Sequence, residues 1–284
     1  MDRSDSASRW RKLAQVFTRP VLSAVAREGS VRPMHARMRA AGMTVTKGSP
    51  IAPLLDECLF NLQRNYRCEY VYKAAVGDRI VFGRHSPRTA SLQVELPVGR
   101  SIVDLAVFNG TSTAYEIKTE FDSDKRLVSQ TPDYLKAFDQ VFVVTHADMA
   151  ERCLSMLDTR VGILVLNDRG RLTTVRSAVS ADGRIDSATL FRMLRRAEYQ
   201  AAVGRLLGPQ PDLPNGQVHA HYSRLWATLS PEEAHRAFVA AMRDRTTQPH
   251  SVDFLTALPA SLRVLGYATP LSAVQRQRIL NVLH

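Results

Sequence analysis

Two carboxylates and one lysine lie close together in the sequence, in a pattern that could bind a metal ion and act on a phosphate. Asp104 interrupts the otherwise apolar run 101–108, whose composition predicts a strand buried on both faces. The pair Asn109-Gly110 predicts a tight turn, after which the chain returns through a second run containing Glu116 and Lys118. Because Glu116 and Lys118 are two positions apart, they project from one face of a strand and form a patch with Asp104.

Charged groups in such an apolar setting need a partner, because burying an unpaired charge is costly. Oxygen ligands from Asp104 and Glu116, together with the carbonyl of Ile117, suit Mg²⁺ or Mn²⁺. Lys118 would then orient or deprotonate an attacking water and stabilise negative charge on phosphorus. The simpler alternative is a surface ion pair between Glu116 and Lys118 on a half-exposed strand, because Glu-x-Lys alone is a common sequence.

The order of an Asp, a hairpin and then Glu-x-Lys resembles the PD-(D/E)XK nuclease superfamily, and Asp104 and Glu116-Ile117-Lys118 carry the match. The QxxxY element of the RecB-like branch of that superfamily is matched by Gln130 and Tyr134. The resemblance implies a Mg²⁺ or Mn²⁺ cofactor bound by Asp104 and Glu116. It also implies that Gln130 and Tyr134 point toward the metal site or position the substrate.

The resemblance covers residues 50 to 175 and includes the segments 66–73, 115–127 and 138–145, which are similar to a group of poorly characterised bacterial proteins in the superfamily. Val103 stands where a proline often precedes the Asp, at a position that carries no chemistry. Pro132 falls inside the QxxxY element, where it removes a backbone donor.

Glu95 is a candidate third carboxylate at the end of the predicted strand 92–96. If the turn 97–99 folds it back beside Asp104, it becomes a further metal ligand. The alternative is an ion pair with Arg100 across the turn. Segment 69–82 reads as a strand or an irregular hairpin. A second polar set that could reach a substrate lies in this part of the chain: Arg67, Glu69, Tyr72 and Lys73.

Hydrophobic periodicity predicts an α/β protein with additional helices at both ends. Helices are expected at 9–17, 20–27, 31–41, 50–64 and 149–157, and further strands at 140–145, 161–166 and 172–175. From residue 186 the pattern is helical, at 187–207, 222–229, 231–245, 252–258 and 273–283. The β–α–β alternation favours parallel strands. We therefore expect a restriction-endonuclease-like mixed central sheet flanked by helices, in a nuclease-like core (49–180) between a basic helical segment (1–48) and a helical C-terminal region (181–284).

The excess of positive charge lies at the two ends of the 284-residue chain. The net charge is +11, of which residues 1–50 carry +7, residues 51–184 carry none and residues 185–284 carry +4. Basic flanks around a neutral core suit a protein that holds a nucleic-acid backbone, and DNA is the expected partner. The alternative is a well-solvated surface rich in arginine.

Three further features concern location and assembly. No apolar run is long enough to span a membrane, and residues 1–13 have no apolar region of a signal peptide, so we expect a cytoplasmic protein. The three scattered cysteines suit reduced thiols. Cleavage of both DNA strands by one site per chain would favour a homodimer, and the C-terminal helices could dock a partner protein.

The sequence thus predicts a Mg²⁺-dependent deoxyribonuclease, with a role in phage defence or mobile-element biology. The alternative is a module that keeps the nuclease fold and binds nucleic acid or a partner without turnover. The basic flanks and the proline inside QxxxY are the features that favour this alternative.

Overall fold

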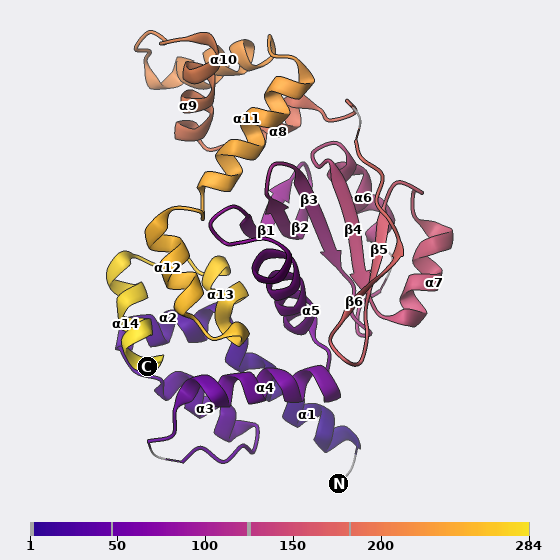
Figure 1. Ribbon diagram of the computed structural model, residues 1–284, viewed down its shortest axis with the longest axis vertical. Coiled ribbons are helices and arrows are strands. Elements are labelled where there is room, and N and C mark those ends of the chain that lie inside the picture. The colour runs from indigo at the N-terminus through magenta and orange to yellow at the C-terminus, as the bar shows by residue number, and fades with distance from the viewer. Residues whose placement is uncertain (1–2, 47, 124–125, 182, 284) are drawn as a thin grey trace.

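Six strands form one mixed sheet at the centre of the protein, in the order β1 to β6 (Figure 1). The computed structural model describes residues 3–46, 48–123, 126–181 and 183–283. The strands are β1 (Ser91–Val98), β2 (Ser101–Phe108), β3 (Ser112–Ile117), β4 (Gln140–Thr145), β5 (Gly162–Leu166) and β6 (Leu172–Arg176). The expected α/β architecture, with a mixed sheet flanked by helices, is confirmed.

The direction of the strands follows from the length of the connections between them. Short turns join β1, β2 and β3, which pair antiparallel. Helices α6 (Leu127–Leu135) and α7 (Ala147–Met156) connect β3 to β4 and β4 to β5, and these three strands are parallel. The final strand, β6, returns antiparallel to β5 through a short hairpin. The predicted β–α–β unit with parallel strands is therefore present.

Helices precede and follow the sheet, as the sequence predicts. The preceding ones are α1 (Arg3–Ala14), η1 (Gln15–Phe17), α2 (Arg19–Glu28), α3 (Arg32–Ala40), α4 (Ile51–Asn65), α5 (Glu69–Val76) and η2 (Gly77–Arg84). The following ones are α8 (Ser187–Met193), α9 (Arg196–Leu207), α10 (Asn215–Trp226), α11 (Pro231–Asp244), α12 (Pro249–Ala257), η3 (Ala260–Leu262), α13 (Arg263–Ala268) and α14 (Ala273–Leu283). No described helix is both long and apolar enough to cross a lipid bilayer.

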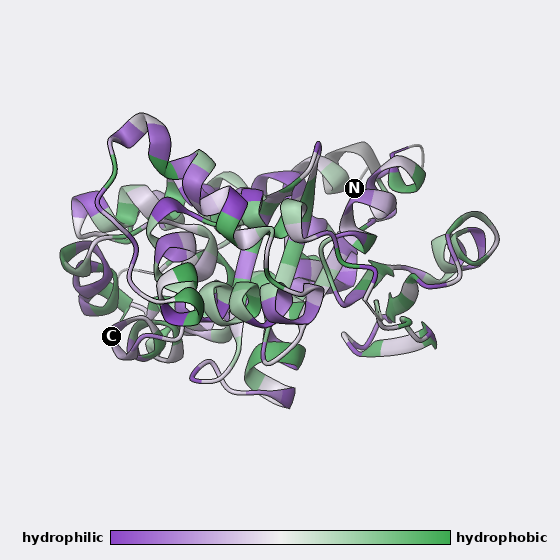
Figure 2. Ribbon diagram, turned by 90° about the horizontal axis from the view of Figure 1, so that it is seen from above, coloured by the Kyte–Doolittle hydropathy of each residue, from purple (hydrophilic) through white to green (hydrophobic). Residues whose placement is uncertain are grey.

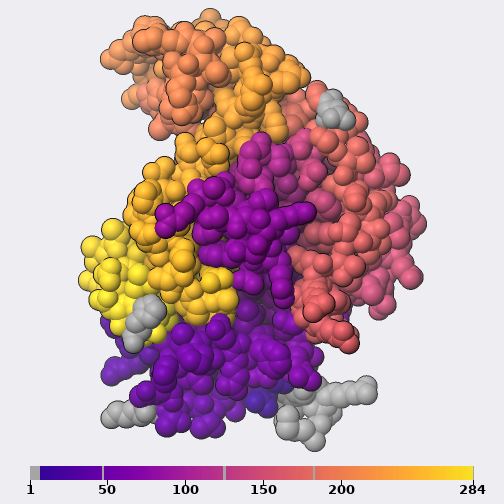
Figure 3. Space-filling model, viewed as in Figure 1, coloured from indigo at the N-terminus to yellow at the C-terminus, as the bar shows by residue number. Residues whose placement is uncertain are grey.

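The sheet separates two hydrophobic cores. One core joins Leu105, Val107 and Tyr115 of the sheet to the helices that precede it and to α12–α14. The other joins Ala106 and Phe108 to helices α6–α11. The helices carry both purple and green segments in Figure 2, as amphipathic elements with one buried side should. In Figure 3 the yellow C-terminal helices lie against the indigo N-terminal ones, and α14 packs on α2.

Two predicted elements differ from the structure. Segment 69–82, expected as a strand or hairpin, is helical: α5 continues into η2, a π-helix. Because Val71, Tyr72, Lys73, Ala74 and Val76 are all buried, α5 lacks the polar face that would have marked it as a helix. The expected helix 187–207 is broken between α8 and α9, where two consecutive residues adopt extended backbone angles.

Candidate active site

The candidate site lies where strands β2 and β3 separate. The last paired residues of this hairpin are Leu105 and Tyr115. One position further along each strand stand Asp104 and Glu116. The backbone N–H of Ile117 donates to Asp104 Oδ2 over 2.7 Å, so the carboxylate takes the place of a strand carbonyl at this point. The split brings the two predicted carboxylates together and fixes the position of Asp104 against the backbone of Ile117.

Glu116 is buried, with 2% of its surface exposed, and three side chains hold its carboxylate. Lys118 Nζ donates to Oε1 over 2.9 Å. Tyr134 Oη lies 2.9 Å from Oε2 and 2.7 Å from the carbonyl oxygen of Ile102, so its single hydroxyl proton lies between two acceptors. Gln130, with its amide nitrogen turned toward Glu116, donates to Oε1 over 3.1 Å. The alternative of an exposed Glu116–Lys118 ion pair on a half-exposed strand is therefore wrong, because the pair is buried.

Helix α6 directs Gln130 and Tyr134 at Glu116. The two residues are four apart and so share one side of the helix, and Pro132 between them does not interrupt it. Tyr134 is fully buried against the sheet. The sequence left open whether these side chains point toward the metal site or toward the substrate. In the structure, both point toward the Glu116 carboxylate.

Asp104 has an unusual acidity because of its surroundings. Burial and the neighbouring Glu116 carboxylate raise its pKa to about 7, against the opposing effects of Lys73 and the Ile117 N–H. The side chain of Asp104 is 20% exposed, so it lies at the opening of the site.

Lys73 and Glu69, which the sequence placed only in a second polar set that could reach a substrate, lie beside the carboxylates of the site. Lys73, on α5, places Nζ 2.5 Å from Glu69, 3.3 Å from Glu95 and 3.8 Å from Asp104. Burial lowers the pKa of Lys73, but the surrounding carboxylates outweigh burial and raise it. The spacing of Glu69 and Lys73 is the helical ion-pair spacing, which was the available signal. The helical spacing of the two residues was not recognised because segment 69–82 was expected to be a strand or a hairpin.

Glu95 faces the same cluster from β1. Its carboxylate pairs with Arg19 over 2.9 Å and with Lys73 over 3.3 Å, and not with Arg100 as the alternative supposed. Glu95 is also the one non-glycine residue with a positive φ (54°) in the described part of the chain. A left-handed backbone at a glutamate is strained. The side chains of β1 switch from one face of the sheet to the other near Glu95, because Leu92 belongs to one hydrophobic core and Leu96 to the other.

The other members of the predicted polar set do not converge on the carboxylates. Arg67 pairs with Glu120 and Asp168. The hydroxyl of Tyr72 is buried without a hydrogen-bond partner in the described structure. A cavity of about 380 Å³ opens beside the cluster and is lined by Glu69, Lys73 and Glu95 among others.

The donor set at the split fits a hard divalent cation. Across the described residues, no group of three or more His, Cys, Asp and Glu side chains is arranged to hold a metal. Mg²⁺, however, is commonly held by one or two carboxylates together with substrate phosphates. Asp104 and Glu116 supply two such carboxylates, and the pKa of Asp104 is raised first by burial and then by the neighbouring Glu116 carboxylate. Among the present contacts, Asp104 Oδ1 has only the distant Lys73 ammonium.

Comparison with known proteins gives the family of this chain. The profile of the family described as Bacteriophage P4 protein cII matches residues 62–264, from α4 to α13 and across the whole sheet. Protein cII of Enterobacteria phage P4 is 31% identical over 84 residues, which are 30% of this chain and 31% of that protein, so the match spans about a third of the relative.

A solved structure, the SPO1766 protein of unknown function from Silicibacter pomeroyi, is similar at 16% identity with a TM-score of 0.29. It covers 44% of this chain and 86% of its own. The family match itself extends over most of the sequence, including every strand. This chain belongs to the bacteriophage P4 protein cII family.

Proposed function

We propose that this protein is a metal-dependent nuclease that hydrolyses phosphodiester bonds of DNA at the split between β2 and β3. The observation that carries the proposal is the pair of the buried Glu116 carboxylate and the partly exposed Asp104 carboxylate, with Lys118 hydrogen-bonded to Glu116. A structural ion pair has no need of a second buried carboxylate that raises the pKa of the first. Such perturbed groups gather at catalytic sites.

Asp104 and Glu116 would hold Mg²⁺ or Mn²⁺, with the carbonyl of Ile117 and the carboxylate of Glu95 as further candidate ligands. Such an ion supplies Lewis-acid stabilisation of a phosphate. Lys118 is 12% exposed at its side chain, which leaves its ammonium able to face a water or a phosphate oxygen at the opening. In the reaction, the oxygen of water forms a new bond to phosphorus while the bond to the departing sugar oxygen breaks and that oxygen is protonated.

Tyr134 and Gln130 act as positioning residues in this proposal. Gln130 donates to the Glu116 carboxylate, and the one hydroxyl proton of Tyr134 lies between that carboxylate and the Ile102 carbonyl of β2. A carboxylate held by three donors keeps one orientation, which is what a metal ligand requires.

The charge of the chain supports a nucleic-acid substrate. The net charge of +11 favours association with a polyanion, and the cytoplasm is where such a substrate would be met. Membership of a family named for a bacteriophage protein supports a role in phage or mobile-element biology.

A second candidate is a nucleic-acid-binding module without turnover. The observation in its favour is that the carboxylates already have partners: Lys73 lies near Asp104, and Lys118 and Tyr134 contact Glu116. In this case Lys73 would take the place of a cation as the permanent counter-charge.

Two measurements distinguish these functions. The first is calorimetric binding of Mn²⁺ to the parent, to Asp104→Ala and to the control Asp253→Ala, whose exposed carboxylate lies far along the chain on α12. The second is cleavage of circular and linear DNA by the same proteins and by Lys118→Ala, after circular dichroism has shown that each variant is folded. If the protein is a nuclease, the parent and Asp253→Ala should bind Mn²⁺ and cleave DNA. Asp104→Ala should do neither. DNA cleavage by folded Asp104→Ala and Lys118→Ala at the parental rate would contradict the nuclease proposal. Salt-dependent DNA binding without cleavage would support the second candidate.

A further inference from the structure

A concave site on the sheet is separate from the carboxylates. A cavity of about 690 Å³ lies between η2 and the uncovered face of strands β3–β6. This volume is within the range of small-molecule sites. Tyr115 lines its floor, and Tyr115 precedes Glu116 on β3, so the two side chains point to opposite faces of the sheet. A ligand here would not occupy the candidate active site.

Cations without carboxylate partners surround this cavity. Arg79, Arg84 and Arg171 line it, and none of the lining residues is acidic. Within the described structure these three guanidinium groups form no ion pair, and the one hydrogen bond among them is a long contact of 3.5 Å from Arg79 to the Gly170 carbonyl. Arginines elsewhere in the protein do pair, for example Arg245 with Glu198. Unpaired guanidinium groups at the rim of a cavity recognise phosphate.

The opposite end of the cavity presents an unsatisfied acceptor. Asn109 places its amide nitrogen 2.7 Å from His85 Nε2, which leaves its Oδ1 buried and without a partner among the described residues. The Tyr115 hydroxyl also makes no hydrogen bond in the described part of the chain, and this oxygen is accessible rather than buried. A buried polar atom usually has a partner, so the lack of one at Asn109 Oδ1 points to a ligand.

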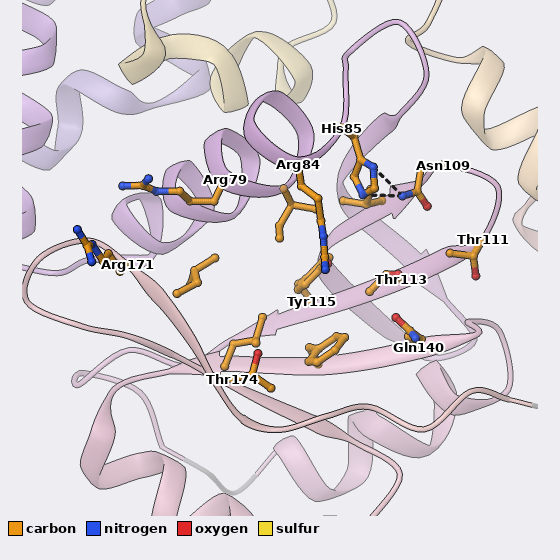
Figure 4. Close-up of a pocket in the computed structure, with 15 residues that line it drawn as sticks. Arg79, Arg84, His85, Asn109, Thr111, Thr113, Tyr115, Gln140, Arg171 and Thr174 are labelled. Atoms are coloured by element: carbon orange, nitrogen blue, oxygen red, sulfur yellow. Dashed lines mark hydrogen bonds between the residues drawn. The ribbon is translucent and has the colours of Figure 1, made fainter.

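Between the two ends lies an apolar floor. The rings of Tyr115 and Phe142 are stacked 5.7 Å apart with 13° between their planes. Figure 4 shows Arg79 and Arg171 at one end, His85 and Asn109 at the other, and Arg84 extending toward Tyr115 between them. The cavity therefore has two guanidinium groups at one end, an aromatic surface beside Arg84 in the middle and a hydrogen-bond acceptor at the far end.

We propose that this cavity binds a nucleoside phosphate. Such a ligand carries an anionic group, an aromatic base and hydrogen-bond donors, which match the guanidinium groups, the aromatic floor and the acceptor of the cavity. Its phosphates would lie against Arg79 and Arg171, its base against the aromatic floor, and an amino or hydroxyl donor against Asn109. This site goes beyond the proposed nuclease function and does not depend on it.

The test is calorimetric titration of the full chain with ATP, in EDTA so that no divalent cation contributes. ATP binding should weaken at least tenfold in the double variant Arg79→Gln/Arg171→Gln, because both proposed phosphate contacts are lost. It should weaken about threefold in Tyr115→Phe, which keeps the ring and removes the unpartnered hydroxyl. Arg88→Gln is the matched control: an exposed arginine outside the cavity, whose side chain makes no hydrogen bond in the described structure, and it should bind ATP as the parent does.

Two comparisons separate the nucleoside phosphate from related anions. Inorganic triphosphate should bind at least tenfold more weakly than ATP, because it lacks the base. A single-stranded DNA 12-mer should displace ATP only at a higher concentration than ATP itself requires. Equal affinity for triphosphate and ATP, parental affinity in the double variant, or displacement by the 12-mer at a lower concentration would each overturn the proposal; the last would assign the cavity to a nucleic-acid strand.

Discussion

Lys73 Nζ lies 3.8 Å from Asp104 Oδ1 and joins helix α5 to the point where β2 and β3 separate. This ammonium is almost fully buried and lowers the pKa of Asp104 against the opposing effects of burial and Glu116. It therefore sets how much negative charge the candidate site carries in the absence of a bound metal. The pairing also explains how a helix outside the Asp and Glu-x-Lys motif comes to control the chemistry of that motif.

Replacement of Lys73 by methionine should raise the pKa of Asp104 above its parental value of about 7. The reason is that burial and Glu116 would then act on the carboxyl without an opposing ammonium. The titration of the Asp104 carboxyl carbon, followed by ¹³C NMR, measures this directly. Lys12→Met removes an exposed lysine of α1 and serves as the control that should leave the titration unchanged. An unaltered Asp104 titration in Lys73→Met would show that the 3.8 Å pairing has no electrostatic effect.

The same carboxyl should make the protein less stable as the pH rises. The pKa of Asp104 is raised from 3.8 to about 7 on folding, so between these values the folded state binds a proton that the unfolded state has released. The free energy of unfolding therefore falls across this window, by on the order of 2 to 4 kcal/mol. Asp104→Asn keeps the acceptor for Ile117 and removes the titration.

Urea denaturation at pH 4.5 and pH 8 tests this pH dependence. The difference in unfolding free energy between parent and Asp104→Asn isolates this group, because all other titrating residues are common to both. The variant should gain stability relative to the parent at pH 8. Asp253→Asn, at an exposed position, should follow the parent at both values. A difference between parent and Asp104→Asn that is the same at both pH values would contradict the raised pKa.

The part of the site that the sequence predicts is the part built from local patterns. Asp104, the Asn109-Gly110 turn and Glu116 follow one another along a hairpin, and the turn and the alternation of the strands determine which residues meet. Gln130 and Tyr134 are likewise predictable, because a helix places residues four apart on one side. The mixed sheet could be derived in the same way, from connection lengths.

The contribution of α5 could not be predicted by these rules. Segment 69–76 is rich in aromatic and β-branched residues, which favour strands, and it has no amphipathic alternation because nearly all of it is buried. Its helical form depends on packing between the sheet and the surrounding helices, which no local pattern records. The strained backbone of Glu95 and its pairing with Arg19, on α2, are tertiary features of the same kind.

The backbone of Glu95 predicts an inverted order of stability for two substitutions. Glu95→Gly and Glu95→Ala both remove the ion pairs with Arg19 and Lys73, so these contributions cancel between them. At φ 54° alanine is strained and glycine is not, so the glycine variant should be more stable by about 1 kcal/mol. Urea denaturation of both gives the difference. Gln93, on the same strand and without a positive φ, should show the ordinary order with alanine more stable; the ordinary order at position 95 as well would argue against strain there.

Two buried tyrosines should respond oppositely to the loss of their hydroxyl groups. Tyr134 Oη contacts Glu116 and Ile102, so Tyr134→Phe leaves a buried carboxylate oxygen and a carbonyl without this donor. Loss of such a bond to a charged group destabilises a protein by about 1 to 3 kcal/mol. Tyr72 is equally buried, but its hydroxyl has no partner in the described structure, so Tyr72→Phe removes an unsatisfied group and should be neutral or stabilising.

Unfolding in urea at pH 7 measures both tyrosine variants against the parent. Mn²⁺ affinity provides a second measurement that separates the two roles of Tyr134. If Tyr134 positions Glu116 as a ligand, Tyr134→Phe should weaken Mn²⁺ binding about tenfold or more, as loss of a supporting contact does at metal sites. Tyr72→Phe should bind Mn²⁺ as the parent does. Equal losses of stability in the two variants would show that the hydrogen bonds of Tyr134 contribute nothing beyond the burial of its ring, whereas an unchanged Mn²⁺ affinity in Tyr134→Phe would restrict that residue to a structural role.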